Sequence, residues 1–119
     1  MIKQLILVGA GGAVGSIIRF LTSEITTRFY SQPFPLATFI VNVVGCLIIG
    51  MLVNTLSAND NLKMLLVVGF CGGFTTFSTF ARESLSLINQ GQSLLALVYI
   101  TGSCLLGVFA VWLGMLIVK

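Results

Sequence analysis

The chain has 119 residues, of which 57% are hydrophobic and 8% are charged, and its formal net charge is +3. Soluble domains carry about 25% charged residues, so this composition excludes a soluble domain and indicates an integral membrane protein. The sequence contains no histidine and its charges stand singly, which excludes a Ser-His-Asp triad or a histidine metal site and argues against a nucleic-acid-binding surface.

The first apolar segment covers about residues 2–21. A signal peptide is the competing interpretation, but a single early lysine and the lack of a clear cleavage site disfavour it. Gly11 and Gly15 form a GxxxG face that lets another helix approach closely in lipid. Arg19 extends that face: its guanidinium either snorkels to the interface, or is held against facing carbonyls or lines an aqueous vestibule.

Polar residues and two prolines, from Glu24 to Pro35, predict a connection that no helix crosses unbroken. The second apolar segment, about residues 36–56, has roughly the 20 residues needed to cross the hydrocarbon core. Within it, Thr38 and Asn42 are four residues apart and share a helix face. A carboxamide in lipid needs partners, so Asn42 is either an interhelical hydrogen-bonding group or part of a solute path.

The third segment, about residues 62–88, is longer than one straight span and contains the run GFCGGFTTFSTF at 69–80. Paired glycines and β-branched threonines weaken a helix, so a break is expected near residues 72–75. Irregular backbone at membrane depth persists only where protein or a water-filled cavity satisfies its polar groups. We therefore expect the other segments to surround and support this run.

Beyond the expected break, Phe77 and Phe80 stand one helical turn apart. Thr76, Thr79 and Glu83 follow a helical spacing beside them, which predicts an aromatic stripe next to a stripe of hydroxyls and a carboxylate. A phenylalanine stripe alone is typical of lipid-facing or core packing. The interleaved hydroxyl groups make a polar path the competing interpretation.

The fourth segment, about residues 94–118, carries Tyr99, Ser103 and Gly107 along one helix face, either as interhelical contacts or as one wall of a polar track. Residues 1–119 thus form one four-span domain. Four spans put both termini on one side of the membrane, and lysines and arginines show almost no bias between the two sides. Such a chain suits insertion in both orientations.

Three motifs carry a resemblance to a known family: GFCGGFTTFSTF, the GGxxGxxxR that ends at Arg19, and the TxxxN that ends at Asn42. In these motifs, and in length and span order, the chain resembles the Fluc (CrcB) fluoride channels. The resemblance implies an all-α integral membrane protein with a broken third helix, assembled as an antiparallel dual-topology homodimer. It also implies passive, fluoride-selective export from the cytoplasm through two pores per dimer, in the bacterial cytoplasmic (inner) membrane.

The resemblance also implies roles for individual residues. The implied pore and fluoride-binding residues are Asn42, Phe77, Phe80, Ser78, Thr79, Tyr99 and Ser103. The implied vestibule residues are Arg19 and Glu83. A structural sodium ion at the dimer interface would be held by the backbone carbonyls of Gly72 and Thr75. The chain departs from the family pattern at Phe74, where leucine is common, and at Gly107, where another hydroxyl is expected.

Two other functions remain open from the residues. A small dual-topology proton-coupled multidrug exporter has similar length, but its mechanism needs a carboxylate within the first helix, and none lies between Met1 and Ser23. A structural membrane subunit without transport activity would use its glycine faces only for packing. An enzyme is disfavoured because Glu83, the one carboxylate expected within a span, has no acidic or histidine neighbour. No protein partner other than a second copy, and no nucleic acid, is implied.

Overall fold

A computed structural model describes residues 1–56 and 60–118, and their regular structure is helical throughout. The elements in chain order are α1 (Ile2–Phe29), α2 (Leu36–Val53), the π-helical segment η1 (Lys63–Cys71), α3 (Gly72–Phe74), α4 (Ser78–Asn89) and α5 (Ser93–Ile117). Four stretches in this part of the chain, α1, α2, residues 63–89 and α5, are long and apolar enough to cross a membrane. The predicted all-α protein with four spans is confirmed.

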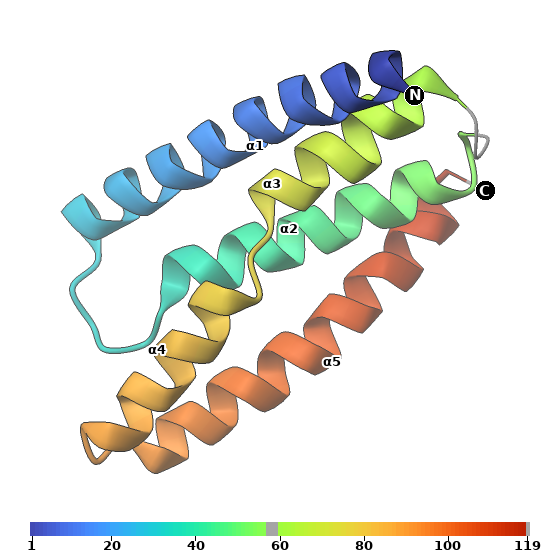
Figure 1. Cartoon of the computed structure of the whole chain (residues 1–119). Helices are drawn as coiled ribbons and strands as arrows, with labels where there is room; N and C mark the ends of the chain where they lie inside the picture. Colours follow the sequence, from blue (N-terminus) through green and yellow to red (C-terminus); the bar gives the residue numbers. More distant parts are fainter. Residues whose placement is uncertain (57–59, 119) are drawn as a thin grey trace.

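The helices run side by side along one long axis (Figure 1). The first turn of α1 and the last turn of α5 lie at one end of the bundle, and the α1–α2 connection and the α4–α5 turn lie at the other. The molecule measures 47 × 28 × 24 Å. Its long axis is close to the roughly 40–45 Å of a bilayer with its headgroups.

Helix α1 packs along η1 and α3, while α2 packs along α5, which also carries α4. Glycines allow α1 to come into close contact with η1 and α3. A Cβ added to Gly11 would meet the Leu65 carbonyl oxygen and lie 2.8 Å from the Phe70 nitrogen, and one added to Gly15 would lie 2.8 Å from the Phe74 nitrogen. In lipid, where van der Waals contact replaces the hydrophobic effect between helices, such approach is a main source of association. The predicted helix-packing role of the GxxxG face is confirmed.

Replacing Gly15 by alanine should therefore loosen α1 from η1 and α3. Its Cβ would meet the Phe70 carbonyl oxygen and the Phe74 nitrogen, and overpacking against rigid backbone costs about 1–3 kcal/mol. We expect a corresponding loss in the free energy of unfolding, measured by denaturant titration in detergent. Gly9→Ala is the matched control, because a Cβ there meets no described neighbour within 4 Å. Equal stability of the two variants would contradict the close-packed seam.

Helix α1 continues past residue 21, where the first span was expected to end, and stops at Phe29. Its polar residues do not end it, because the hydroxyls of Thr22 and Thr27 donate to the carbonyls four residues earlier, at 2.9 and 2.7 Å. Back-bonding of this kind lets threonine stay in a helix without an outside partner. The connection to α2 is therefore shorter than predicted and covers residues 30–35.

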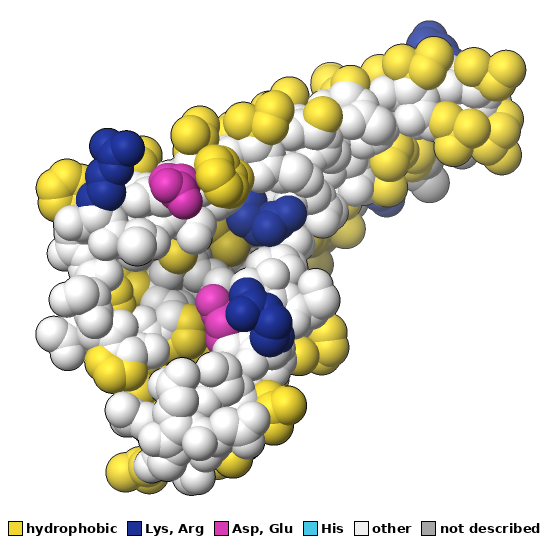
Figure 2. All heavy atoms as spheres, turned by 60° about the vertical axis from the view of Figure 1, so that its left-hand side comes forward, with side chains coloured by type: hydrophobic (Ala, Val, Ile, Leu, Met, Phe, Trp, Pro, Cys, Tyr) yellow, Lys and Arg dark blue, Asp and Glu magenta, His cyan; other side chains and the backbone are white. Residues whose placement is uncertain are grey.

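Large apolar side chains cover the outer surface of the subunit, as the yellow side chains in Figure 2 illustrate. The most exposed include Ile2, Phe29, Phe77, Leu94 and Val108. A water-soluble monomer rarely exposes continuous apolar surface of this extent. This surface is suited to lipid and to a second protein subunit.

Candidate functional site

Helix α3 and helix α4 are separated by three residues, 75–77, that lie outside both helices. Thr75 has an extended backbone with φ −86° and ψ 159°. Gly72, expected within the interruption, is helical with φ −62° and ψ −36°. Gly73 is used instead for close packing, since a Cβ there would lie 3.0 Å from the Gly12 Cα. Hence the chain departs from helix geometry at the threonines and not at the glycines.

Side chains from α1 and α2 take over backbone hydrogen bonds at this interruption. The Asn42 carboxamide makes two bonds to one residue: Nδ2 donates to the Thr76 carbonyl at 3.0 Å, and Oδ1 accepts from the Thr76 N–H at 2.8 Å. Arg19 Nε donates to the Gly73 carbonyl at 3.0 Å. The Thr79 N–H donates to Thr76 Oγ1 at 3.3 Å. Of the alternatives for Arg19, the structure therefore supports the one that holds its guanidinium against a facing carbonyl.

A cavity of about 280 Å³, the aromatic cavity, opens beside the interruption. It is lined by Asn42, Cys46, Ile49, Thr75, Thr76, Phe77, Phe80, Ser103 and Cys104. Four of the predicted pore residues are thus brought together from α2, α4, α5 and the interruption, without a charged side chain among the lining residues. Ser103 Oγ is buried and has no hydrogen-bond partner in the part of the chain described here.

The two phenylalanines of the aromatic cavity are held differently. Their ring centroids are 5.9 Å apart. Phe80 packs against Tyr99, with ring centroids 5.0 Å apart, and joins the buried cluster around Leu87. Phe77 is 78% exposed. Core packing therefore accounts for the position of Phe80 but not for that of Phe77.

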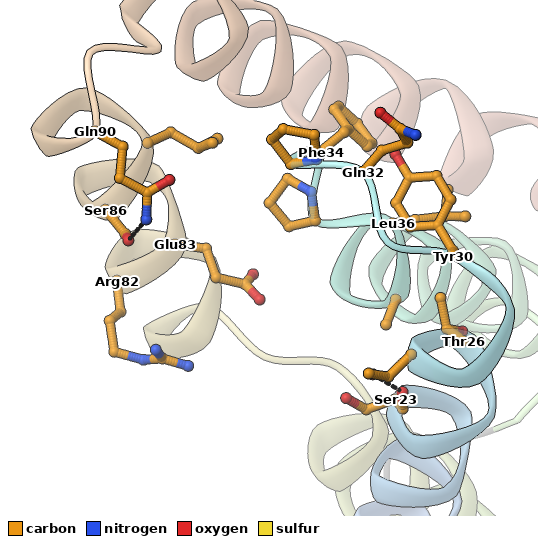
Figure 3. Close-up of a pocket in the computed structure, with 15 residues that line it drawn as sticks. Ser23, Thr26, Tyr30, Gln32, Phe34, Leu36, Arg82, Glu83, Ser86 and Gln90 are labelled. Atoms are coloured by element: carbon orange, nitrogen blue, oxygen red, sulfur yellow. Dashed lines mark hydrogen bonds between the residues drawn. The ribbon is translucent and has the colours of Figure 1, made fainter.

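A second hollow, the vestibule, consists of two adjoining cavities of about 230 and 270 Å³ between α1, the start of α2 and α4. Both cavities are lined by Ser23, Ala37, Arg82 and Glu83. Figure 2 shows basic and acidic side chains bordering the hollow at this end of the molecule. Figure 3 shows that Arg82 and Glu83 project from α4 on one side, with Ser23 on α1 opposite them.

Some of the predicted polar residues line these two spaces, whereas Tyr99 and Ser78 line neither. Arg19, Thr79 and Glu83 line the vestibule, whereas Ser103 lines the aromatic cavity. Tyr99 is fully buried, and its hydroxyl donates to Glu83 Oε1 at 3.0 Å. Ser78 is exposed at the start of α4.

Two residues of this region were missed among the predicted site residues. Thr76 lines both the aromatic cavity and the vestibule, and it carries both of the hydrogen bonds from Asn42. Arg82 lines both cavities of the vestibule. The spacing of Thr76 with Thr79 and Glu83 was a usable signal, whereas Arg82 is an isolated charge whose position depends on how α4 packs.

The side chains offer little to a metal ion. In residues 1–56 and 60–118, no group of three or more His, Cys, Asp or Glu side chains could hold one. The three cysteines are free: Cys71 is buried, Cys46 half-buried and Cys104 exposed. Any cation here would depend on backbone oxygens.

Comparison with known proteins gives a consistent result. Residues 6–115 match the family model described as "CrcB-like protein, Camphor Resistance (CrcB)". The chain is 39% identical to the fluoride-specific ion channel FluC of Flavobacterium psychrophilum over 98% of both chains. It is 42% identical to the protein of the same name from Phocaeicola vulgatus, over 94% of this chain and 95% of the relative. It is also 42% identical to the Aquifex aeolicus protein of that name, over 90% of both chains.

Proposed function

Since the chain belongs to the CrcB family, we propose that it is a passive, fluoride-selective ion channel. It is a multi-pass protein of the bacterial inner membrane, with four spans. The observation that carries the proposal is the aromatic cavity. Its lining joins two phenyl rings, a carboxamide and a buried hydroxyl that has no hydrogen-bond partner among the described residues, and none of its lining side chains is charged. The role is transport without catalysis, as the names of the relatives indicate.

The chemistry of this cavity suits a small anion that must enter and leave quickly. A phenyl ring has a positive edge, so Phe77 and Phe80 can face an anion without trapping it as a full cation would. The Ser103 hydroxyl has a proton to donate, and its oxygen is buried without a hydrogen-bond partner in residues 1–56 and 60–118. Hydroxyl donors replace part of a hydration shell, and conduction needs binding that is favourable but weak enough to release.

The vestibule supplies the approach to this cavity. Arg19 and Glu83 line it, and Thr76 stands between it and the aromatic cavity. A basic group in a confined entrance raises the local concentration of anions. The remaining polar residues, Thr79 and Ser78, with Tyr99 bonded to Glu83, would continue the path along α4 and α5. Fluoride accumulated in the cytoplasm would leave through it down its gradient.

The proposed assembly is an antiparallel dual-topology homodimer with two pores. Two features of the single subunit support a partner near the interruption: Phe77 is 78% exposed, and no atom of another described residue is recorded within 4 Å of a Cβ added to Gly72. Phenyl rings from two subunits would then complete each aromatic cavity. The near-even distribution of basic residues between the two ends suits opposite orientations.

The proposed sodium ion fits the backbone at the interruption. In a continuing helix, the carbonyls of Gly72 and Thr75 would accept from the N–H groups of Thr76 and Thr79. Those N–H groups donate to Asn42 Oδ1 and Thr76 Oγ1 instead. Two carbonyls per subunit would make a set of hard oxygen donors at a twofold axis. A bound cation would neutralise their partial charges and link the two subunits.

Fluoride efflux from liposomes that hold the purified protein tests the function. With a fluoride electrode as the readout, we expect rapid fluoride loss once a potassium ionophore sets the membrane potential, with chloride retained in a parallel experiment. Fluoride retained by liposomes with a correctly reconstituted, folded protein would overturn the channel proposal. Proton-dependent drug transport would then favour the exporter, and no transport of either kind would favour a structural subunit.

A further inference from the structure

The Asn42 carboxamide holds both polar groups of a single residue. Its Nδ2 donates to the Thr76 carbonyl at 3.0 Å and its Oδ1 accepts from the Thr76 N–H at 2.8 Å, across 34 residues of sequence. One N–H of the carboxamide and part of the acceptor capacity of its oxygen remain. Contact with a permeating ion therefore does not account for most of the hydrogen bonding that Asn42 makes in the structure.

These two bonds change what is available at Gly72. A helix that continued past residue 74 would direct the Thr76 N–H to the Gly72 carbonyl. Asn42 Oδ1 takes that donor, while the preceding donor, the Thr75 N–H, bonds to the Cys71 carbonyl at 3.0 Å. The Gly73 carbonyl, one residue further, is occupied by Arg19. Of these three donors, one bonds to the Cys71 carbonyl, one to the Gly73 carbonyl and one to Asn42 Oδ1, and none of the three bonds to the Gly72 carbonyl.

We propose that Asn42 is a positioning residue for the cation site: by binding the Thr76 peptide, it keeps the Gly72 carbonyl available to the sodium ion. The inference rests on the sodium ion of the proposed function. Asn42 would then have two separable effects, one on sodium binding and one on fluoride passage, because the same carboxamide lines the aromatic cavity through which fluoride would pass. Asn42 thus joins the anion path to the cation site through one peptide group.

The chemistry of the side chain separates these effects. Aspartate keeps an oxygen that can accept the Thr76 N–H, so the Gly72 carbonyl stays free, although the donor to the Thr76 carbonyl is lost. Leucine has a similar size but can neither accept from the Thr76 N–H nor donate to the Thr76 carbonyl. The Thr76 N–H can then bond to the Gly72 carbonyl as the next helical hydrogen bond. An Asn42 that served only as a fluoride contact, or only for packing, would have no such effect on a cation held by carbonyls.

The experiment measures how strongly sodium stabilises the purified dimer, with no transport readout. Protein is prepared in N-methyl-D-glucamine buffer, and the thermal midpoint is followed as sodium replaces that cation at constant ionic strength. We expect the half-maximal sodium concentration to rise about tenfold in Asn42→Leu, as expected for one backbone contact, and to stay at or below the wild-type value in Asn42→Asp. Asn54→Leu is the matched control, because Asn54 is exposed at the end of α2, away from the interruption.

The outcomes separate the inference from the function on which it rests. If sodium does not stabilise the wild-type protein, both the proposed cation site and the positioning role of Asn42 are wrong. A wild-type response shared unchanged by Asn42→Leu would overturn the positioning role alone. Where Asn42→Leu yields no dimer, Asn42→Asp decides: its carboxylate both keeps an acceptor for the Thr76 N–H and attracts a cation, so a tenfold weaker response than that of the wild type would overturn the inference.

Discussion

Replacing Asn42 by aspartate is expected to reduce fluoride efflux by about a thousandfold. Asn42 lines the aromatic cavity, where an ionised carboxylate would face the permeating anion. Two unit charges about 4 Å apart interact by about 4 kcal/mol at an effective dielectric constant of 20, and every 1.4 kcal/mol is tenfold in an equilibrium constant. The measurement is the initial rate of fluoride loss from liposomes at equal protein density.

Asn42→Leu separates the charge effect from the loss of the hydrogen bonds. It breaks both bonds to Thr76 but introduces no negative charge, so its efflux should lie between those of the wild type and Asn42→Asp. Efflux from Asn42→Asp within tenfold of the wild-type rate would show that the aromatic cavity is not on the fluoride path. Size-exclusion profiles of the variants check that each remains a folded assembly.

The second large effect is expected at Phe77. The side chain is 78% exposed in the subunit, so its truncation to alanine removes little packing within the chain. As a ring that would face fluoride, however, it contributes to the path itself. We expect Phe77→Ala to remain a folded assembly by its size-exclusion profile while fluoride efflux falls at least about tenfold, a loss of about 1.4 kcal/mol.

Phe29→Ala is the matched control for Phe77→Ala. Phe29 is 85% exposed at the last residue of α1, and it does not line the aromatic cavity. Its truncation should change neither efflux nor the thermal midpoint. Wild-type efflux in Phe77→Ala would refute the assignment of this ring to the pore, whereas equal losses in both variants would point to a general effect of removing surface aromatics.

The helical spans were predictable because a bilayer imposes a length and a composition on each of them. Their ends were less predictable. The limit of α1 depends on Thr22 and Thr27, whose hydroxyls bond within their own helix, and no hydropathy pattern reports that choice. The π-helical bonding of residues 63–71 and the pairing of α1 with η1 and of α2 with α5 likewise depend on contacts between segments.

In the candidate site too, patterns within one segment predicted part of the arrangement, and contacts between segments decided the rest. Glycine and threonine composition indicated where the third segment would be weak, but Gly73 fits against Gly12 within a helix and the extended residue is Thr75. Helical spacing placed Phe77 near Phe80. Nothing in the spacing within any one segment could predict that Asn42 bonds to both polar groups of Thr76, because that contact depends on how α2 faces the interruption.

The open surface at Gly72 has a consequence for how the chain exists in a membrane. In the described part of the chain, nothing is recorded within 4 Å of a Cβ placed there, and the Thr76 N–H that would bond to its carbonyl in a continuing helix bonds to Asn42 instead. A backbone polar group set against hydrocarbon costs several kcal/mol. A lone subunit diluted in lipid would bear that cost, which a second subunit and a cation would remove. Its conformational stability would then follow mass action, set by the number of copies per lipid and not by one chain alone.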